Sequence, residues 1–521
     1  MHILFAPFQR LRHRVFWPPF ILLALAAFAV YRDSAKFLKD TTLANVWILD
    51  RFGWLFSVGS FVMVGVCIWI YFSPLAAYRI GGPDAKPILT RWRWFTVVLC
   101  TTVAIGVMFW ATAEPLHHLH HPPQSWHIEP DSAQAAQFAL SAMYLHWTFT
   151  PYAIYTLPAL MFALAYYNMG RPFSLGSTLA PLFGGRAPDS LIDAICLYAL
   201  VAGMAASLGT GILTLAGGIG YLTGIASSPA LMGIIACAVV GSFILSSMSG
   251  LMKGIRILSD LNAKVFVGLA LFVLLAGPTG FILSFGAEAL GSYMTNFFSL
   301  SLFTGSAAGD DWPQKWTIFY WANWMAWAPI TAMFLGRIGY GYTVREFVLF
   351  NWIIPAVFGA VWMTIFSGTA IYMEQYGGGP DLFAMLETSG PESVVYGMFS
   401  SFPLATPFIL LFILTSFLSY VTAADSNTSA MGGISTTGIS PESPEPGAAI
   451  KAIWGITVGA VAWFMVSEGG INGIKTLSQL GGLPALFLVL AVTVAIMRVA
   501  ANPARFLSEP IRADRIPTGE E

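Results

Sequence analysis

The sequence predicts an all-α polytopic membrane protein with twelve transmembrane helices and both termini in the cytoplasm. Of its 521 residues, 56% are hydrophobic and only 10% are charged, which leaves too little polar surface for a water-soluble fold. Apolar runs long enough to cross a bilayer core of about 30 Å recur along the chain. With both termini on one side, 19 of the 25 Lys and Arg residues fall on that side, and such a bias is typical of cytoplasmic loops.

Each predicted span is a stretch of about 20 mostly apolar residues between clusters of Gly, Pro or charged residues. The first run follows Arg10, Arg12 and Arg14 without a small-residue cleavage site, so we expect it to remain as the first helix. The fourth and tenth runs are long enough to contain a turn or a break. The approximate cores are residues 16–30, 54–76, 95–113, 135–167, 190–216, 229–250, 262–285, 313–336, 347–373, 403–433, 448–467 and 481–500.

An amphipathic helix is predicted between the seventh and eighth spans, over residues 286–302. Leu290, Tyr293, Met294 and Phe298 recur there at helical spacing, so they share one apolar face. A helix of this kind lies flat on a membrane interface. We expect it on the outer surface, where it would also provide a contact between protomers.

Two stretches are rich in aromatic residues, His146–Tyr155 and Tyr320–Trp327. Trp147 and Tyr155 are eight residues apart, and the tryptophans of the second stretch follow in steps of three, so each set projects from about one side of its helix. The face of an aromatic ring attracts a cation by about 0.5–2 kcal/mol. The pattern predicts a box for a methylated onium group. The alternative, which the pattern leaves open, is an interfacial belt or plain packing.

Glycine-rich segments interrupt the third run at Ala104–Gly106, the fifth at Ser207–Gly218 and the tenth at Ala423–Ser426. Transporters break helices at such places to expose backbone groups to ions and substrate. Small residues also allow helices to pack closely, so both interpretations remain open. Asp425 is the ionisable residue placed deepest in a predicted span, and it is expected either to form a structural contact or to serve in gating or coupling.

Residues 117–121 are all histidine except Leu119, and His127 follows shortly after. We expect this histidine cluster to lie in an outer loop. It raises the alternative of a membrane-embedded metalloenzyme. Such enzymes need several histidine boxes on one side of the membrane, and this chain has one. We therefore expect neither a metal site nor an enzyme. A sensor or channel is a further alternative.

Several motifs together resemble the betaine/choline/carnitine transporter family, in the family's order over roughly residues 78–438. The resemblance implies uptake of a small quaternary ammonium or related onium solute, such as choline, betaine, carnitine or a sulfonium analogue, by alternating access. The matching segments are Met108–Leu116, His146–Tyr155, Ser249–Ile255 with Leu258, Ser259 and Asn262, Phe319–Ile338 and Thr422–Ser426.

The resemblance also implies an architecture, in which two five-helix repeats of inverted topology, a LeuT-like arrangement, follow two extra helices. It implies a homotrimer in a bacterial inner membrane, with no nucleic-acid partner. The corresponding segments are a short N-terminus (1–15), the extra helices (16–76), the first repeat (95–285), the amphipathic helix (286–302), the second repeat (313–500) and a short C-terminus (501–521).

The family's site residues carry over to positions in both aromatic stretches. Trp147, Tyr152, Tyr155 and Trp324 are similar to the central box. Trp321 and Trp327 are similar to rings along the path to the cytoplasm, and Asn323 stands where Trp is common.

The coupling ion is left open by the resemblance. Sodium-coupled members have a Thr-Ser pair in the tenth helix, whereas this chain has Thr422-Ala423 and lacks one hydroxyl oxygen that a hard cation would bind. Val103, in the third helix, and Asp425 complete the candidate coupling positions. Sodium, protons and solute exchange all remain possible, and no other cofactor is expected.

Overall fold

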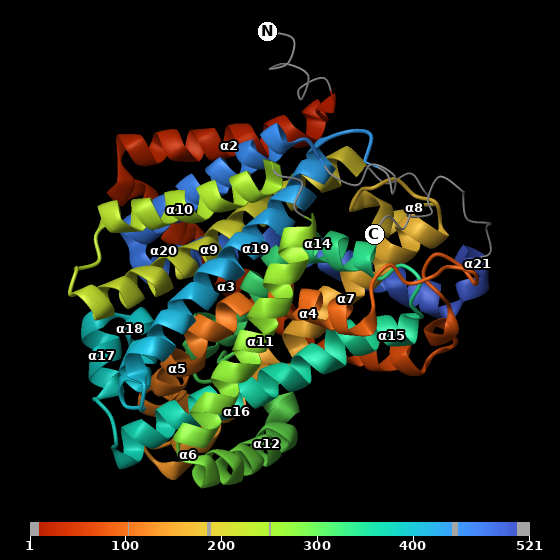
Figure 1. Ribbon diagram of the computed structural model, residues 1–521. Coiled ribbons are helices and arrows are strands. Elements are labelled where there is room, and N and C mark those ends of the chain that lie inside the picture. Colours follow the sequence, from red (N-terminus) through yellow and green to blue (C-terminus); the bar gives the residue numbers. More distant parts are fainter. Residues whose placement is uncertain (1–9, 103, 185–188, 249–251, 440–445, 508–521) are drawn as a thin grey trace.

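The computed structural model describes residues 10–102, 104–184, 189–248, 252–439 and 446–507. These residues form a bundle of helices (Figure 1). Within the described ranges no strand occurs, and the β-type pairing amounts to two isolated bridges. In the described part of the chain, six helices are long and apolar enough to cross a membrane, or seven if one bent pair is a single span. The all-α membrane fold class is therefore confirmed.

The first half of the chain runs from the N-terminal helices to the bend near residue 277. Its helices are α2 (His13–Arg32), α3 (Ser34–Phe72), η2 (Pro74–Ala77), α4 (Arg91–Thr102), α5 (Ala104–His120), η3 (Gln124–Trp126), α6 (Ala133–Trp147), α7 (Phe149–Ala163), η4 (Leu164–Asn168), η5 (Gly176–Leu179), α8 (Ala180–Phe183), α9 (Asp189–Thr223), α10 (Pro229–Met248) and α11 (Met252–Ala276).

The second half contains two long helices, α19 and α20, and several short outer ones. Its helices are α12 (Thr279–Ser301), α13 (Trp312–Lys315), α14 (Thr317–Ile338), α15 (Val344–Val348), η6 (Leu349–Ile353), α16 (Ile354–Tyr376), α17 (Leu382–Ser389), α18 (Pro391–Ser400), α19 (Ala405–Ser435), α20 (Ala448–Ala501) and α21 (Pro503–Leu507).

The fourth predicted run is divided within the aromatic stretch. Helix α6 ends at Trp147 and α7 begins at Phe149, because Thr148 adopts φ −122° and ψ −115° and interrupts the helix. Helices α4 and α5 together cover the third predicted run. The predicted coupling position Val103, which lies between them, is outside the described residues, and so is part of the Ser249–Ile255 motif.

The predicted breaks in the fifth and tenth runs are wrong. Helix α9 continues through Ser207–Gly218, and α19 continues through Ala423–Ser426. The glycines of α9 instead allow close packing. A Cβ on Gly211 would lie 2.5 Å from the ring of Tyr420 in α19, too close for any other residue without a shift.

Helix α20 covers both the eleventh and twelfth predicted runs. Its backbone is non-helical at Gly470, with φ 52° and ψ −138°, a conformation that suits glycine. Beyond this point the helix packs closely on α14, since a Cβ on Gly482 would lie 2.5 Å from the carbonyl oxygen of Ala322. This path brings Ile474, Lys475 and Ser478 towards the aromatic stretch of α14.

Helix α12 follows a bend of 107° after the segment Asp260–Ala276. Tyr293 is buried, while Leu290, Met294 and Phe298 are exposed. The helix thus carries an uncovered apolar face, and its placement at the membrane interface stays a prediction.

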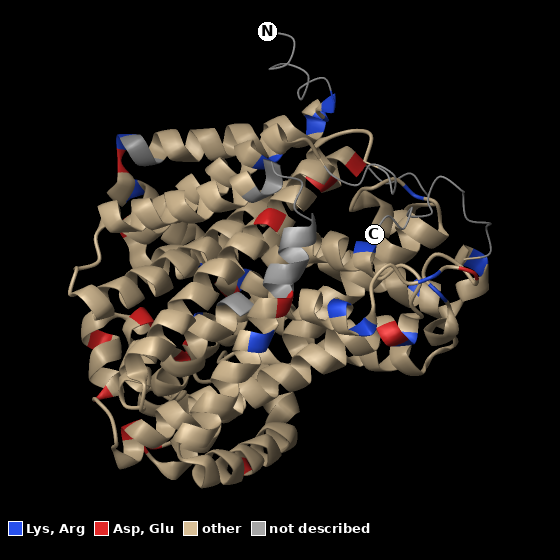
Figure 2. Cartoon of the chain, viewed as in Figure 1, with Lys and Arg blue, Asp and Glu red and all other residues tan. Residues whose placement is uncertain are grey.

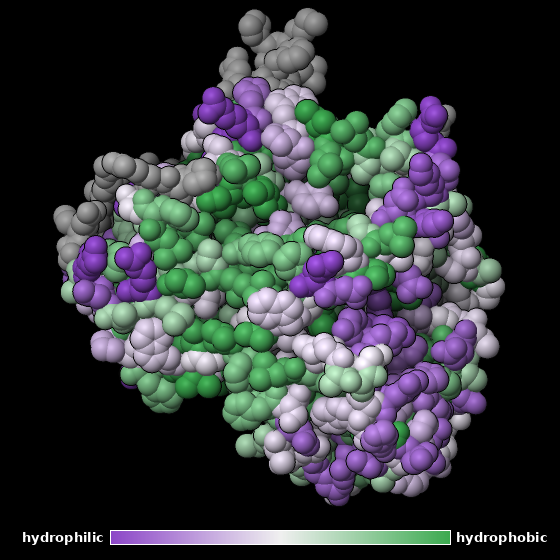
Figure 3. All heavy atoms as spheres, turned by 180° about the vertical axis from the view of Figure 1, so that it is seen from behind, coloured by the Kyte–Doolittle hydropathy of each residue, from purple (hydrophilic) through white to green (hydrophobic). Residues whose placement is uncertain are grey.

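Charged residues are sparse in the helical body and gather towards opposite ends of the molecule. In Figure 2 many Lys and Arg residues lie on the right, near α8, α15 and α21, while acidic residues line the lower left, near α17 and α18. From behind, a broad hydrophobic surface crosses the middle of the molecule (Figure 3). A bilayer would cover such a surface.

Candidate functional site

A cavity lies among α4, α5, α6, α7, α9, α14 and α20, and aromatic rings form much of its wall. The indole of Trp324 is central: its ring centroid lies 5.5 Å from that of Trp147 and 5.2 Å from that of Tyr155, with interplanar angles of 77° and 68°. The lining residues are Thr102, Gly106, Trp110, Trp147, Tyr155, Ala206, Ser207, Thr210, Phe319, Asn323, Trp324, Trp327, Ile474 and Ser478.

The local sequence explains how these rings meet. The break at Thr148 lets Trp147 end one helix while Tyr155 projects from the next. Gly106 of α5 lies directly against the indole of Trp147, and a Cβ there would be 2.5 Å from the ring. Trp324 and Trp327 are three residues apart on α14 and therefore face the same side.

Five of the seven predicted substrate-binding residues line this cavity: Trp147, Tyr155, Asn323, Trp324 and Trp327. Trp327 also lines an adjoining cavity, so it separates the two spaces.

The other two predicted residues do not line the cavity. Tyr152 is fully buried with its ring 6.1 Å from that of Trp324. Trp321 is fully buried against His146, at a ring separation of 6.0 Å. Both rings support the wall from behind.

Five hydroxyl or amide side chains also line the cavity: Thr102, Ser207, Thr210, Asn323 and Ser478. The side-chain oxygen of Asn323 accepts a hydrogen bond from the hydroxyl of Ser478, at 2.9 Å. The indole nitrogen of Trp324 is buried and, among the described residues, has no hydrogen-bond partner. A space with several aromatic rings in its wall and no charged side chain among its lining residues suits an apolar cation better than a strongly hydrated ion.

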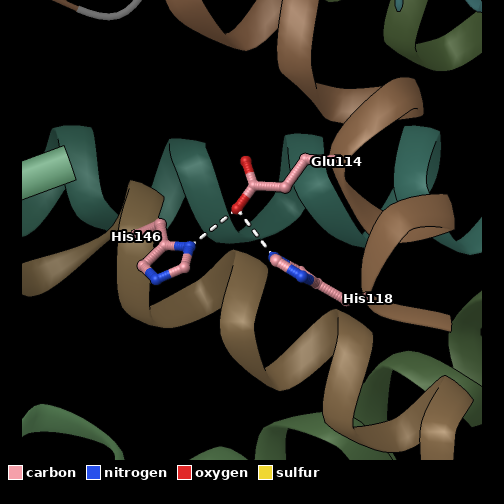
Figure 4. Close-up of side chains that lie close together, drawn as sticks. All are labelled: Glu114, His118 and His146. Atoms are coloured by element: carbon pink, nitrogen blue, oxygen red, sulfur yellow. Dashed lines mark hydrogen bonds and ion pairs between the residues drawn. The ribbon is translucent and has the colours of Figure 1, made fainter. Parts of the chain in front are cut away.

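Beside the cavity lies a buried polar network around Glu114, which sequence reasoning named only as part of a family motif. One carboxylate oxygen faces His146 Nδ1 at 2.6 Å and His118 Nε2 at 3.2 Å (Figure 4). The other accepts hydrogen bonds from the indole of Trp147, at 2.8 Å, and from the hydroxyl of Tyr320, at 2.5 Å. The network therefore fixes the orientation of a ring that lines the cavity.

Three side chains of this network also lie close enough together to share a metal ion. One ligand atom each from Glu114, His118 and His146 lies within 4.8 Å of the others. Both imidazoles, however, face the same carboxylate oxygen, and the second oxygen is taken by indole and phenol donors. A ring N–H donor such as that of Trp147 cannot ligate a cation. The arrangement fits a hydrogen-bonded anchor for Trp147 better than a metal site.

The histidine cluster does not lie in a loop as expected, because α5 extends through His120. Its members point to different partners. His117 packs on the ring of Trp316, His118 joins Glu114, and His120 contacts Asp131 at 2.9 Å and Glu374 at 3.0 Å. Helical spacing spreads consecutive residues around the axis, so the cluster forms no common centre.

The candidate coupling residues lie in the middle of α19. The hydroxyl of Thr422 donates to the carbonyl of Leu418 at 2.7 Å, and Ala423 lines the adjoining cavity. Asp425 is almost fully buried, and Lys451 Nζ lies 3.9 Å from its carboxylate. A cationic group of the protein thus already neighbours this carboxylate.

Comparison with known proteins agrees with this geometry. The family model described as the betaine/carnitine/choline family transporter matches residues 14–505. The chain belongs to this transporter family. Its function is accordingly the transport of quaternary ammonium solutes across a membrane, and not catalysis.

Relatives in this family carry different substrate names. The chain is 30% identical to the glycine betaine transporter OpuD of Bacillus subtilis, over 96% of this chain and 97% of the relative. It is 32% identical to the betaine/ectoine transporter LcoP of Corynebacterium glutamicum, over 93% and 77%. Identity to the high-affinity choline transport protein of Escherichia coli is 29%, over 91% and 69%.

Proposed function

We propose that this transporter takes up a small onium solute, such as choline, betaine, carnitine or a sulfonium analogue, by alternating access. The observation that carries the proposal is the cavity where the ring centroid of Trp324 lies 5.5 Å from that of Trp147 and 5.2 Å from that of Tyr155. A cation without N–H donors gains from contact with ring faces and loses little hydration. The names of the relatives, which include betaine, ectoine and choline, support the same class of solute.

The finer architecture belongs to the same proposal. Alternating access requires two units that move relative to each other around a fixed site. We assign these units to the two five-helix repeats, residues 95–285 and 313–500, within a total of twelve spans. The cavity supports this assignment, because its wall combines α5, α7 and α9 of the first unit with α14 and α20 of the second.

We further propose a homotrimer in a bacterial inner membrane with both termini cytoplasmic. The distribution of Lys and Arg supports the orientation. The exposed apolar face of α12, which includes Leu290, Met294 and Phe298, supports a contact between protomers.

For the coupling ion, we propose protons or solute exchange in preference to sodium at α19. Thr422 uses its hydroxyl hydrogen for a backbone carbonyl, and Ala423 supplies no oxygen from its side chain. Lys451 lies beside Asp425, so its positive charge opposes a second cation there.

Transport by purified protein in liposomes tests the proposal. Radiolabelled choline, glycine betaine, carnitine and a sulfonium analogue would be offered under a sodium gradient, a potassium gradient and a pH gradient. We expect at least one onium solute to accumulate, without a requirement for sodium. If none of them is bound or accumulated under any gradient, the proposed function is wrong.

A further inference from the structure

Lys475 of α20 places an ammonium group close to the cavity without lining it. Its Nζ lies 4.1 Å from the ring centroid of Trp316, 5.1 Å from that of Phe319 and 5.5 Å from that of Trp110. Phe319 and Trp110 also line the cavity. The ammonium group therefore lies behind two rings of the cavity wall, on the helix that also contributes Ile474 and Ser478 to that wall.

The ammonium group has no acceptor of its own within the described part of the chain, where its contacts are with aromatic rings. Two other charged groups act on it electrostatically: the carboxylate of Glu114 attracts the ammonium group, and the ammonium group of Lys315 repels it. Both oxygens of Glu114 are already taken by His118, His146, Trp147 and Tyr320. A lysine ammonium has three donors, so these donors remain to be satisfied by water or by a solute.

A cation next to an onium site affects solutes according to their charge. It repels a solute whose only charge is the onium group. It attracts one that also carries a carboxylate, and the partly dehydrated surroundings strengthen both effects. The names of the relatives do not decide between the two classes, because betaine is a zwitterion and choline a monocation.

We propose that Lys475 makes this site selective for zwitterionic onium carboxylates. The onium group would contact Trp147, Tyr155 and Trp324, and the carboxylate would point towards Lys475. This inference rests on the proposed function and extends that function by naming the charge class of the substrate.

Two matched pairs of solutes test the inference on the unmodified protein. Glycine betaine and choline share a trimethylammonium group, but only the first has a carboxylate. Glycine betaine and its methyl ester differ only in whether the carboxylate is charged. We expect isothermal titration to show at least about tenfold weaker binding of choline and of the ester. Equal or tighter binding of choline and the ester would overturn the inference.

Variants then assign the preference to this side chain. Lys475→Met is expected to reduce the ratio of the choline to the betaine dissociation constant to about threefold or less, while Lys475→Arg keeps the preference. Lys264→Met is the control, since this exposed lysine pairs with Asp260 at 2.6 Å and is not among the charged groups that act on Lys475. It should leave the ratio unchanged.

The outcomes separate the two proposals. If Lys475→Met binds choline and betaine with the wild-type ratio, or weakens both equally, Lys475 is not a specificity residue and the onium site stands. Binding of choline by Lys475→Met also shows that this variant is folded. If the unmodified protein binds no onium solute, the proposed function fails instead.

Discussion

At the scale of single residues, Glu114 connects the buried polar network to the cavity. Four side chains hold its carboxylate, and one of them is Trp147, which lines the cavity. Sequence reasoning could not find this network, because its members lie 4, 32, 33 and 206 residues from Glu114. The sequence did contain one indication of the network: the carboxylate of Glu114 stands at the end of an apolar run, four residues before His118. A carboxylate at such a position is costly to bury without partners.

Replacing Glu114 by alanine should destabilise the fold. The change leaves two buried imidazoles, an indole and a phenol without their acceptor, which costs about 3 kcal/mol or more. The midpoint of thermal unfolding in detergent should fall clearly, and Glu114→Gln, which keeps the shape, should lower it less. Glu129→Ala is the control at an exposed glutamate. An unchanged midpoint in Glu114→Ala would mean that the network does not stabilise the protein.

At the scale of helices, the length of an apolar run predicted a possible break correctly in one case. The fourth run was long enough to contain a break, and it is broken at Thr148. The glycines of the fifth run admitted two interpretations, and partner helices decided between them. Gly211 leaves room for Tyr420, a residue that lies 209 positions later in the sequence. Local sequence cannot predict a packing partner at that separation.

The outer helix α18 packs closely on the end of α9. The hydroxyl of Tyr396 donates to the carbonyl of Thr214 at 2.6 Å, and a Cβ on Gly217 would lie 3.0 Å from Cγ of Glu392. Burial raises the pKa of Glu392 from its ordinary value of 4.5 to about 7. The folded protein therefore favours the protonated form of this side chain.

This shift gives the stability a pH dependence of defined sign. Between pH 4.5 and about 7 the folded state holds more protons on Glu392 than the unfolded state, so its contribution to stability falls as the pH rises through this range. Glu392→Gln cannot ionise and should lose this part of the dependence. Unfolding midpoints of both proteins from pH 5 to pH 8 provide the measurement. Parallel curves would show that Glu392 contributes no such dependence.

At the scale of the whole molecule, composition and the length of the apolar runs were together enough to predict a helical membrane protein. The few charged residues exclude a water-soluble fold, and runs of about 20 apolar residues fit helices that cross a bilayer. The aromatic stretches also predicted five of the residues that line the cavity: Trp147, Tyr155, Asn323, Trp324 and Trp327. What they could not predict was which rings face inward. Tyr152 and Trp321 differ from Trp324 by their direction on the helix, and that direction depends on how α7 and α14 pack.

The central claim is that faces of aromatic rings bind an onium group in this cavity. Its most direct test is the dissociation constant of a transported onium solute, measured by isothermal titration for wild type, Trp324→Ala and Trp54→Ala. Trp54 is the matched control, because its indole is 56% exposed on α3. Loss of one ring face should weaken binding by about 1–2 kcal/mol, or roughly five- to thirtyfold, in Trp324→Ala alone. Wild-type affinity in Trp324→Ala would contradict the claim.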